Sequence, residues 1–201
     1  MKKIFLKTVV LVSMASLFYN CQPIVKAVYG IKNPKITNTT ETQKFLSKKQ
    51  ITGEDVYFNS ATDLSKATKG GGFSLPDAIF YNKKGQQVNF RTKASECTND
   101  ITLFIKNINQ IDSLPVKEGI ELNSLLNHIS DSKGNVIQPS ENADAVVFLN
   151  WSTYMGKLNK TVFEWTDILQ KTSDGNDVKV EYYLLSFDFL DSWEDKHLIK
   201  K

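Results

Sequence analysis

The sequence predicts one α/β domain in which a mixed sheet is flanked by helices. Residues 144–189 read as an apolar strand, a turn, an amphipathic helix and a second apolar strand, which is the pattern of a parallel βαβ unit. Residues 77–91 read as two apolar runs joined by a turn that ends in Gly85, which is typical of an antiparallel hairpin. A parallel and an antiparallel pair together indicate a mixed sheet.

The first residues have the pattern of a secretory signal peptide, expected over residues 1–20. Lys2 and Lys3 precede a largely apolar run that is short for a membrane span of about 20 residues. Residues 1–20 hold three lysines, so without them the 25 basic residues fall to 22 and equal the 22 acidic ones. The remaining chain is therefore close to neutral, and we expect no nucleic-acid partner.

Residues 21–38 follow as an expected tether, and residues 39–201 form the expected domain. The tether contains Pro23 and Pro34 and shows no sustained period, although its apolar residues also allow part of it to dock. A chain of this size buries roughly 70% of its unfolded surface, so it needs neither disulfides nor a metal for stability.

Local patterns predict the elements of the domain in order. Helices are expected at residues 41–49 with a cap at Thr39 or Thr40, at the polar stretch 63–69, at 99–111, at 124–129 and from Leu158 through Val162 and Trp165 to Leu169. Strands are expected at residues 56–58, 77–81, 86–91, 145–151 and 178–189. The nearly unbroken apolar run 145–151 is typical of a strand covered on both faces.

The turn of the βαβ unit resembles the redox turn of thioredoxin-like proteins. VVFLNWSTYMGKLNK is similar to their apolar strand, W-x-x-W-C-G-P-C motif and helix start. The matching places are taken by Trp151, Thr153, Tyr154 and Gly156. Met155 and Leu158 stand where both cysteines would be, and Lys157 replaces the proline.

The hairpin carries a second part of this resemblance. SLPDAIFYNKKGQQVNF is similar to the thioredoxin segment in which a cis proline leads into an edge hairpin and a final helix. Pro76 would be that proline, and residues 99–111 that helix. Because the hairpin half precedes the βαβ half here, the resemblance implies a circularly permuted or otherwise rearranged thioredoxin-like domain, over about residues 55–110 and 144–190.

The end of the predicted signal peptide resembles the cleavage region of bacterial lipoprotein signal peptides. Such signals leave a cysteine, here Cys21, as the new amino terminus with diacylglycerol on its thiol and often a third acyl chain, such as palmitate, on its amine. Phe18, Tyr19 and Asn20 depart from the usual Leu, small residue and Gly or Ala. The resemblance, together with a general style similar to lipoproteins of the Bacteroidota, implies attachment to the lipid bilayer through Cys21 in the cell envelope, at the outer membrane rather than the inner. An uncleaved anchor and an ordinary secreted form are the alternatives.

Candidate chemistry is sparse. Thiol exchange needs an attacking thiolate and a second thiol, and Met155 and Leu158 supply neither. Cys97 stands just before a predicted helix whose dipole would lower the thiol pKa, while Glu96 would raise it. His128 and His197 have no partner at metal-ligand spacing, so we expect structural histidines, no metal and no cofactor.

These observations favour a membrane-anchored lipoprotein whose redox-inactive thioredoxin-like domain binds an envelope protein or peptide. Candidate binding residues are Trp151, Thr153, Tyr154, Met155, Lys157 and Pro76, and Tyr182, Tyr183 and Trp193 add aromatic surface. The alternative is an enzyme with Cys97 as its single catalytic thiol. A third possibility, a scaffold without a small ligand, predicts no pocket beside residues 151–157.

Overall fold

The structure is a computed structural model that describes residues 26–69, 73–91, 98–119, 121–175 and 178–199. The signal peptide, Cys21, the glycines at 70–72 and Cys97 lie outside these residues. No helix among the described residues is long and apolar enough to cross a membrane.

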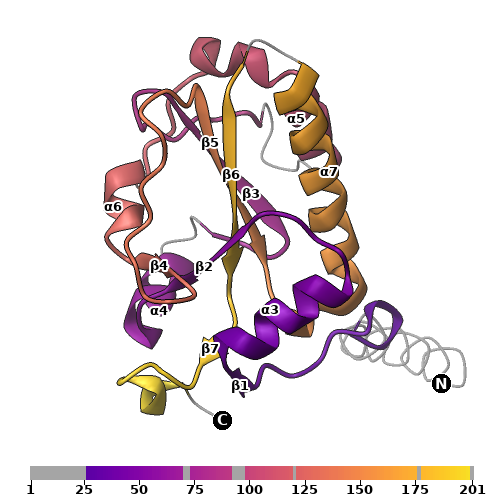
Figure 1. Cartoon of the computed structure of the whole chain (residues 1–201), viewed down its shortest axis with the longest axis vertical. Coiled ribbons are helices and arrows are strands. Elements are labelled where there is room, and N and C mark those ends of the chain that lie inside the picture. The colour runs from indigo at the N-terminus through magenta and orange to yellow at the C-terminus, as the bar shows by residue number, and fades with distance from the viewer. Residues whose placement is uncertain (1–25, 70–72, 92–97, 120, 176–177, 200–201) are drawn as a thin grey trace, which may run out of the picture.

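A five-stranded mixed sheet with helices on both faces forms the body of the protein (Figure 1). Its strand order is β3 (Asp77–Asn82), β5 (Ala145–Trp151), β6 (Val180–Ser186), β2 (Glu54–Phe58) and β4 (Ile129–Asp131). β5, β6 and β2 are mutually parallel, whereas β3 runs antiparallel to β5 and β4 antiparallel to β2. The predicted mixed α/β sheet is confirmed, and the βαβ unit and the first hairpin strand belong to the same sheet.

Helices cover the two faces of the sheet. α4 (Ala61–Lys69) and α6 (Leu122–Leu126) lie on one side, and α5 (Thr98–Lys106) and α7 (Asn159–Gly175) pack together on the other (Figure 1). α3 (Thr39–Lys48) lies below α7 and sends Leu46 into the same core. The short helices of 3₁₀ type are η1 (Ile108–Ser113), η2 (Thr153–Leu158) and η3 (Lys196–Leu198).

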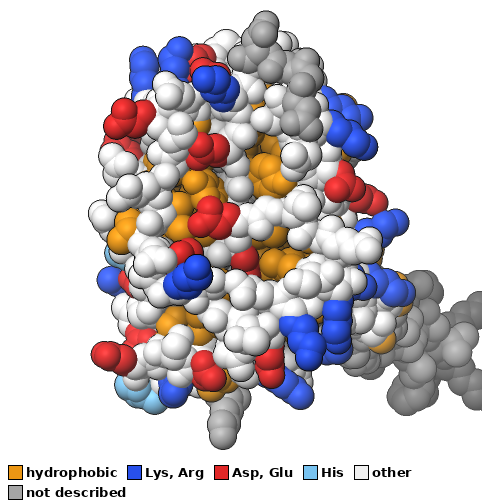
Figure 2. Space-filling view, viewed as in Figure 1, with side chains coloured by type: hydrophobic (Ala, Val, Ile, Leu, Met, Phe, Trp, Pro, Cys, Tyr) orange, Lys and Arg blue, Asp and Glu red, His pale blue; other side chains and the backbone are white. Residues whose placement is uncertain are grey.

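The alternation of side chains along the strands divides the interior into two cores. Val146 and Phe148 of β5 join the core under α4 and α6, whereas Val147 and Leu149 join the core under α5 and α7. Trp165 lies in the second core with no exposed surface. Figure 2 shows apolar side chains in the middle of the viewed face, with a few charged side chains among them and more charged side chains toward its edges. Both faces of the central strands are thus buried, which explains their continuous apolar sequences.

Several element boundaries differ from the sequence prediction. The helix expected at residues 99–111 ends at Lys106 and continues as η1, and α3 is capped by the side chain of Asn38 rather than by a threonine. Ile129 belongs to β4, a three-residue strand too short for a periodic pattern to reveal. Beyond the hairpin turn, the described residues make only isolated bridges, such as the one between Tyr81 and Gln87.

Part of the segment expected as a tether is docked on the domain. The backbone N–H of Lys32 donates to the carbonyl of Tyr154 at 2.8 Å, and β1 (Ile36–Thr37) pairs in parallel with β7 (Phe189–Leu190). Gly156 has a φ of 56°, and a Cβ there would lie 2.3 Å from the carbonyl oxygen of Tyr29. Residues within 29–37 therefore contact the domain in this structure.

Candidate functional site

A cavity of about 720 Å³ lies beside the turn that follows β5. Its walls are α4 on one side and the C-terminal segment, residues 187–199, on the other, with Tyr154 of η2 and Leu75 at its margin. The large apolar side chains that line it are Leu64, Leu75, Phe187, Phe189, Trp193, Leu198 and Ile199. The cavity is therefore mainly apolar and is built from segments far apart in the sequence.

The buried carboxylate of Asp188 holds together the strand ends beside this cavity. Its side chain is 1% exposed and accepts hydrogen bonds from the hydroxyls of Ser152 (2.7 Å), Thr153 (2.6 Å) and Ser186 (3.2 Å). The backbone N–H of Thr153 donates to it as well, at 3.0 Å. Ser152 and Thr153 follow β5, and Ser186 ends β6. The Asp188 carboxylate therefore holds the carboxyl ends of both strands in place. A buried charge requires such partners, since an unpaired one is costly.

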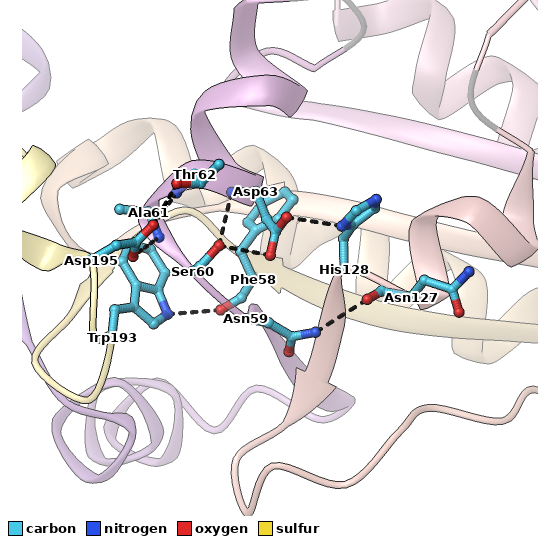
Figure 3. Close-up of polar contacts among 10 residues, drawn as sticks. All are labelled: Phe58, Asn59, Ser60, Ala61, Thr62, Asp63, Asn127, His128, Trp193 and Asp195. Carbon is cyan, nitrogen blue, oxygen red and sulfur yellow. Dashed lines mark hydrogen bonds and ion pairs between the residues drawn. The ribbon is translucent and has the colours of Figure 1, made fainter.

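A second set of contacts fastens the C-terminal segment to the start of α4 (Figure 3). The carboxylate of Asp195 accepts hydrogen bonds from the backbone N–H groups of Ala61 and Thr62 at 2.8 and 2.9 Å, and from the Thr62 hydroxyl at 2.5 Å. These bonds, led by that of the Thr62 side chain, lower the pKa of Asp195. The indole N–H of Trp193 donates to the carbonyl of Phe58 at 2.8 Å. The two cavity walls are thus tied together at one end.

The Leu75 margin is held by the core strand β5. Asn150, which is fully buried, donates from its side-chain amide to the carbonyl of Ser74 at 3.1 Å. The following peptide bond, Leu75–Pro76, is cis. Asp77, at the start of β3, accepts from the Ser74 hydroxyl and pairs with Arg91. This polar set explains why an asparagine interrupts the apolar run of β5.

The candidate binding residues separate into different environments. Tyr154 lines the cavity, where its ring lies 6.5 Å from that of Phe189 and burial raises the pKa of its hydroxyl. Trp151 has no exposed surface and stacks on Phe45 in the opposite core, so it cannot contact a ligand in this conformation. Thr153 binds Asp188 and so orients the turn.

The other predicted residues lie around the same turn. Met155 is half-buried in η2 and Lys157 is exposed there, and neither is among the cavity-lining side chains. Pro76 is adjacent to the lining residue Leu75. Trp193 lines the cavity as aromatic surface, whereas Tyr183 of β6 is buried.

Sequence reasoning missed the α4 wall. The stretch 63–69 was interpreted as a polar helix, yet it supplies Leu64, Lys66 and Lys69 to the cavity. The available signal was the spacing of Ala61, Leu64 and Ala67, which places three apolar side chains on one helix face.

His128 is paired with a carboxylate, whereas His197 is exposed in η3. The Nδ1 atom of His128 lies 2.9 Å from a carboxylate oxygen of Asp63, whose other oxygen accepts from the Ser60 hydroxyl (Figure 3). A smaller cavity of about 100 Å³ adjoins His128. Among the described residues, no three His, Cys, Asp or Glu side chains are grouped closely enough to hold a metal ion.

A second buried carboxylate, Asp55 of β2, lies in the interior. It accepts from the hydroxyl of Tyr57, which lies 2.5 Å from that of Thr42. Its Oδ1 atom and the Nε1 atom of Trp151 lack a hydrogen bond of ordinary geometry, although the nearby indole lowers the carboxyl pKa somewhat. Burial dominates and raises the pKa of Asp55 to about 7.

Comparison of the chain with models of known protein families, with curated proteins and with solved structures finds no match.

The raised pKa of Asp55 predicts a specific pH dependence of stability. Because the folded-state pKa is about 7 and the ordinary value is 3.8, the folded protein binds the extra proton between about pH 4 and 7. Raising the pH through this window therefore costs stability, on the order of 4 kcal/mol for the full shift.

Asp55→Asn removes this titration, so its stability relative to wild type should rise from pH 4 to pH 8. Urea unfolding of both proteins across this range measures the difference, with the exposed Asp167→Asn as control. A difference between Asp55→Asn and wild type that does not change with pH would contradict the assignment.

Proposed function

We propose that the protein is a cell-envelope lipoprotein, anchored in the bilayer through acylated Cys21, whose redox-inactive thioredoxin-like domain acts by binding. The observation that carries the proposal is the mainly apolar cavity of about 720 Å³ beside Tyr154. Ligand sites are concave, mostly apolar and typically about 300–1,000 Å³ in volume. The cavity therefore has the size and character of a binding site, next to the turn that the thioredoxin resemblance singles out.

The arrangement of the sheet supports the thioredoxin-like part of the proposal. The resemblance requires the βαβ half and the hairpin half to share one sheet, and β3 pairs with β5 over six residues. It also requires a helix after the hairpin, and α5 occupies this place and packs against α7. Since β3 precedes β5 in the chain, this would be a rearranged version of the fold.

The chemistry of the turn supports binding over redox catalysis. Met155 and Leu158 occupy the two cysteine positions, and neither side chain can form a disulfide. The alternative of a thiol enzyme using Cys97 stays a prediction, because Cys97 lies outside the described residues. The cavity beside Tyr154 supports binding rather than the third possibility, a scaffold with no pocket near residues 151–157.

Filling the cavity should abolish the binding of a neutral apolar dye. Ser65 of α4 lines the cavity, so Ser65→Phe would place a ring inside it, whereas Ser47→Phe adds the same ring to an exposed site on α3. We expect Nile red fluorescence to be enhanced by the chain from residue 22 onward and by Ser47→Phe. Ser65→Phe should lose most of the enhancement.

Circular dichroism of both variants checks that they are folded. Equal enhancement by Ser65→Phe and Ser47→Phe would show that the dye binds elsewhere, and the proposed site would be wrong.

Replacing Cys21 should release the protein from membranes. Each buried CH₂ of an acyl chain contributes about 0.8 kcal/mol, so two or three chains give stable attachment. The wild-type protein should sediment with membranes through a high-salt wash, and Cys21→Ser should lose acylation. Mass spectrometry of the amino terminus provides the direct measurement, and an unmodified Cys21 in the membrane-bound protein would contradict the anchor.

A further inference from the structure

We propose that the cavity beside Tyr154 binds one long-chain fatty acid, with the hydrocarbon tail between α4 and residues 187–199 and the carboxylate at Lys66 and Lys69. The proposal rests on the proposed binding function and names its ligand. Three properties of the cavity carry it: the distribution of charge, the state of the polar groups in the wall and the volume.

The charged side chains at the cavity are all of one sign. Lys66 and Lys69 of α4 line it, and no Asp or Glu is among its described lining residues. Neither lysine has a carboxylate within ion-pair distance in the part of the chain that the structure describes. The nearby carboxylates are engaged elsewhere, since Asp63 pairs with His128 and Asp195 binds the start of α4. The lysines are three residues apart on one helix, hence neighbours, and complement a single anionic group.

Two of the four hydroxyl groups of the wall, those of Thr62 and Thr68, are already hydrogen-bonded within the protein. Thr62 donates to Asp195, and Thr68 donates to the carbonyl of Leu64 at 3.0 Å. A sugar or nucleotide would leave many of its polar groups unpaired against such a wall, which costs free energy. A hydrocarbon chain needs no hydrogen bonds and gains from covering the incompletely buried side chains of Leu75, Phe189 and Leu198.

The volume fits one chain. If each methylene occupies about as much space as a water molecule in the liquid, roughly 30 Å³, an eighteen-carbon chain needs roughly 540 Å³. The cavity measures about 720 Å³. It therefore has room for a hydrocarbon chain of fatty-acid length.

The placement of the tryptophans gives a direct test. Trp193 lines the cavity, while Trp151 and Trp165 are fully buried in the opposite core. Dibromostearate, whose bromine atoms quench nearby tryptophans, should saturably quench the Trp193 part of the fluorescence of the full chain held in phosphatidylcholine vesicles. Trp193→Phe should remove the saturable component, and Ser65→Phe should block it.

The headgroup assignment is tested with paired lysine variants. Lys66→Gln with Lys69→Gln should weaken dibromostearate binding at least about tenfold and leave binding of its neutral methyl ester unchanged. Lys44→Gln with Lys48→Gln, an exposed pair on α3, is the matched control and should change neither. Competing saturated fatty acids should bind about tenfold more tightly for each two methylenes added.

Several results would overturn the inference. If dibromostearate does not saturably quench Trp193, the fatty-acid inference is wrong. If Nile red still binds in that case, the proposed binding function stands. Equal loss of acid and ester binding in the lysine variants would refute the carboxylate assignment, as would tighter competition by lysophosphatidylcholine than by stearate. Displacement of Nile red by an extended apolar peptide, without quenching by dibromostearate, would identify a peptide as the occupant instead.

Discussion

The structure around the cavity depends on the buried carboxylate of Asp188. Side chains after β5 and at the end of β6 converge on it, so two parallel strands are fixed at their carboxyl ends by one charge. From this point one segment continues as the turn that carries Tyr154, and the other as the wall that carries Phe189 and Trp193. If the carboxylate were absent, hydroxyl and amide donors would be left unpaired in the interior, where each costs about 1–3 kcal/mol.

The position of the cavity follows from the topology of the sheet. Parallel strands end at the same edge, and ligand sites of α/β proteins lie beyond these carboxyl ends. Here β5 and β6 end together, residues 29–32 contact one side of the turn, and α4 lies on the other side of the cavity. Asp195 then ties the end of the C-terminal wall to α4, so the cavity is bounded by contacts between distant parts of the chain.

The features that could be predicted from the sequence are those that a short stretch of residues determines by itself. β5 was predicted at its observed bounds because seven residues buried on both faces leave a continuous apolar run, and Tyr154 was found because it follows this run directly. The α4 wall was missed because a nine-residue helix with two exposed lysines reads as polar. The roles of Asp188 and Asp195 depend on partners 35 and about 134 residues away in sequence, which no local pattern contains. The sequence predicts Trp151 as a binding residue because it adjoins the turn. Side chains alternate between the two faces of a strand, however, and Trp151 lies in the opposite core.

The most direct test of the central role of Asp188 is the stability and dye binding of Asp188→Asn, compared with Asp167→Asn on the exposed face of α7. An amide is similar in shape but presents one acceptor oxygen and two N–H donors, so it cannot serve all four hydrogen-bond donors. We expect Asp188→Asn to lose about 3 kcal/mol of unfolding free energy and most of its Nile red binding, while Asp167→Asn retains both. An Asp188→Asn protein as stable as wild type, with unchanged dye binding, would contradict the account.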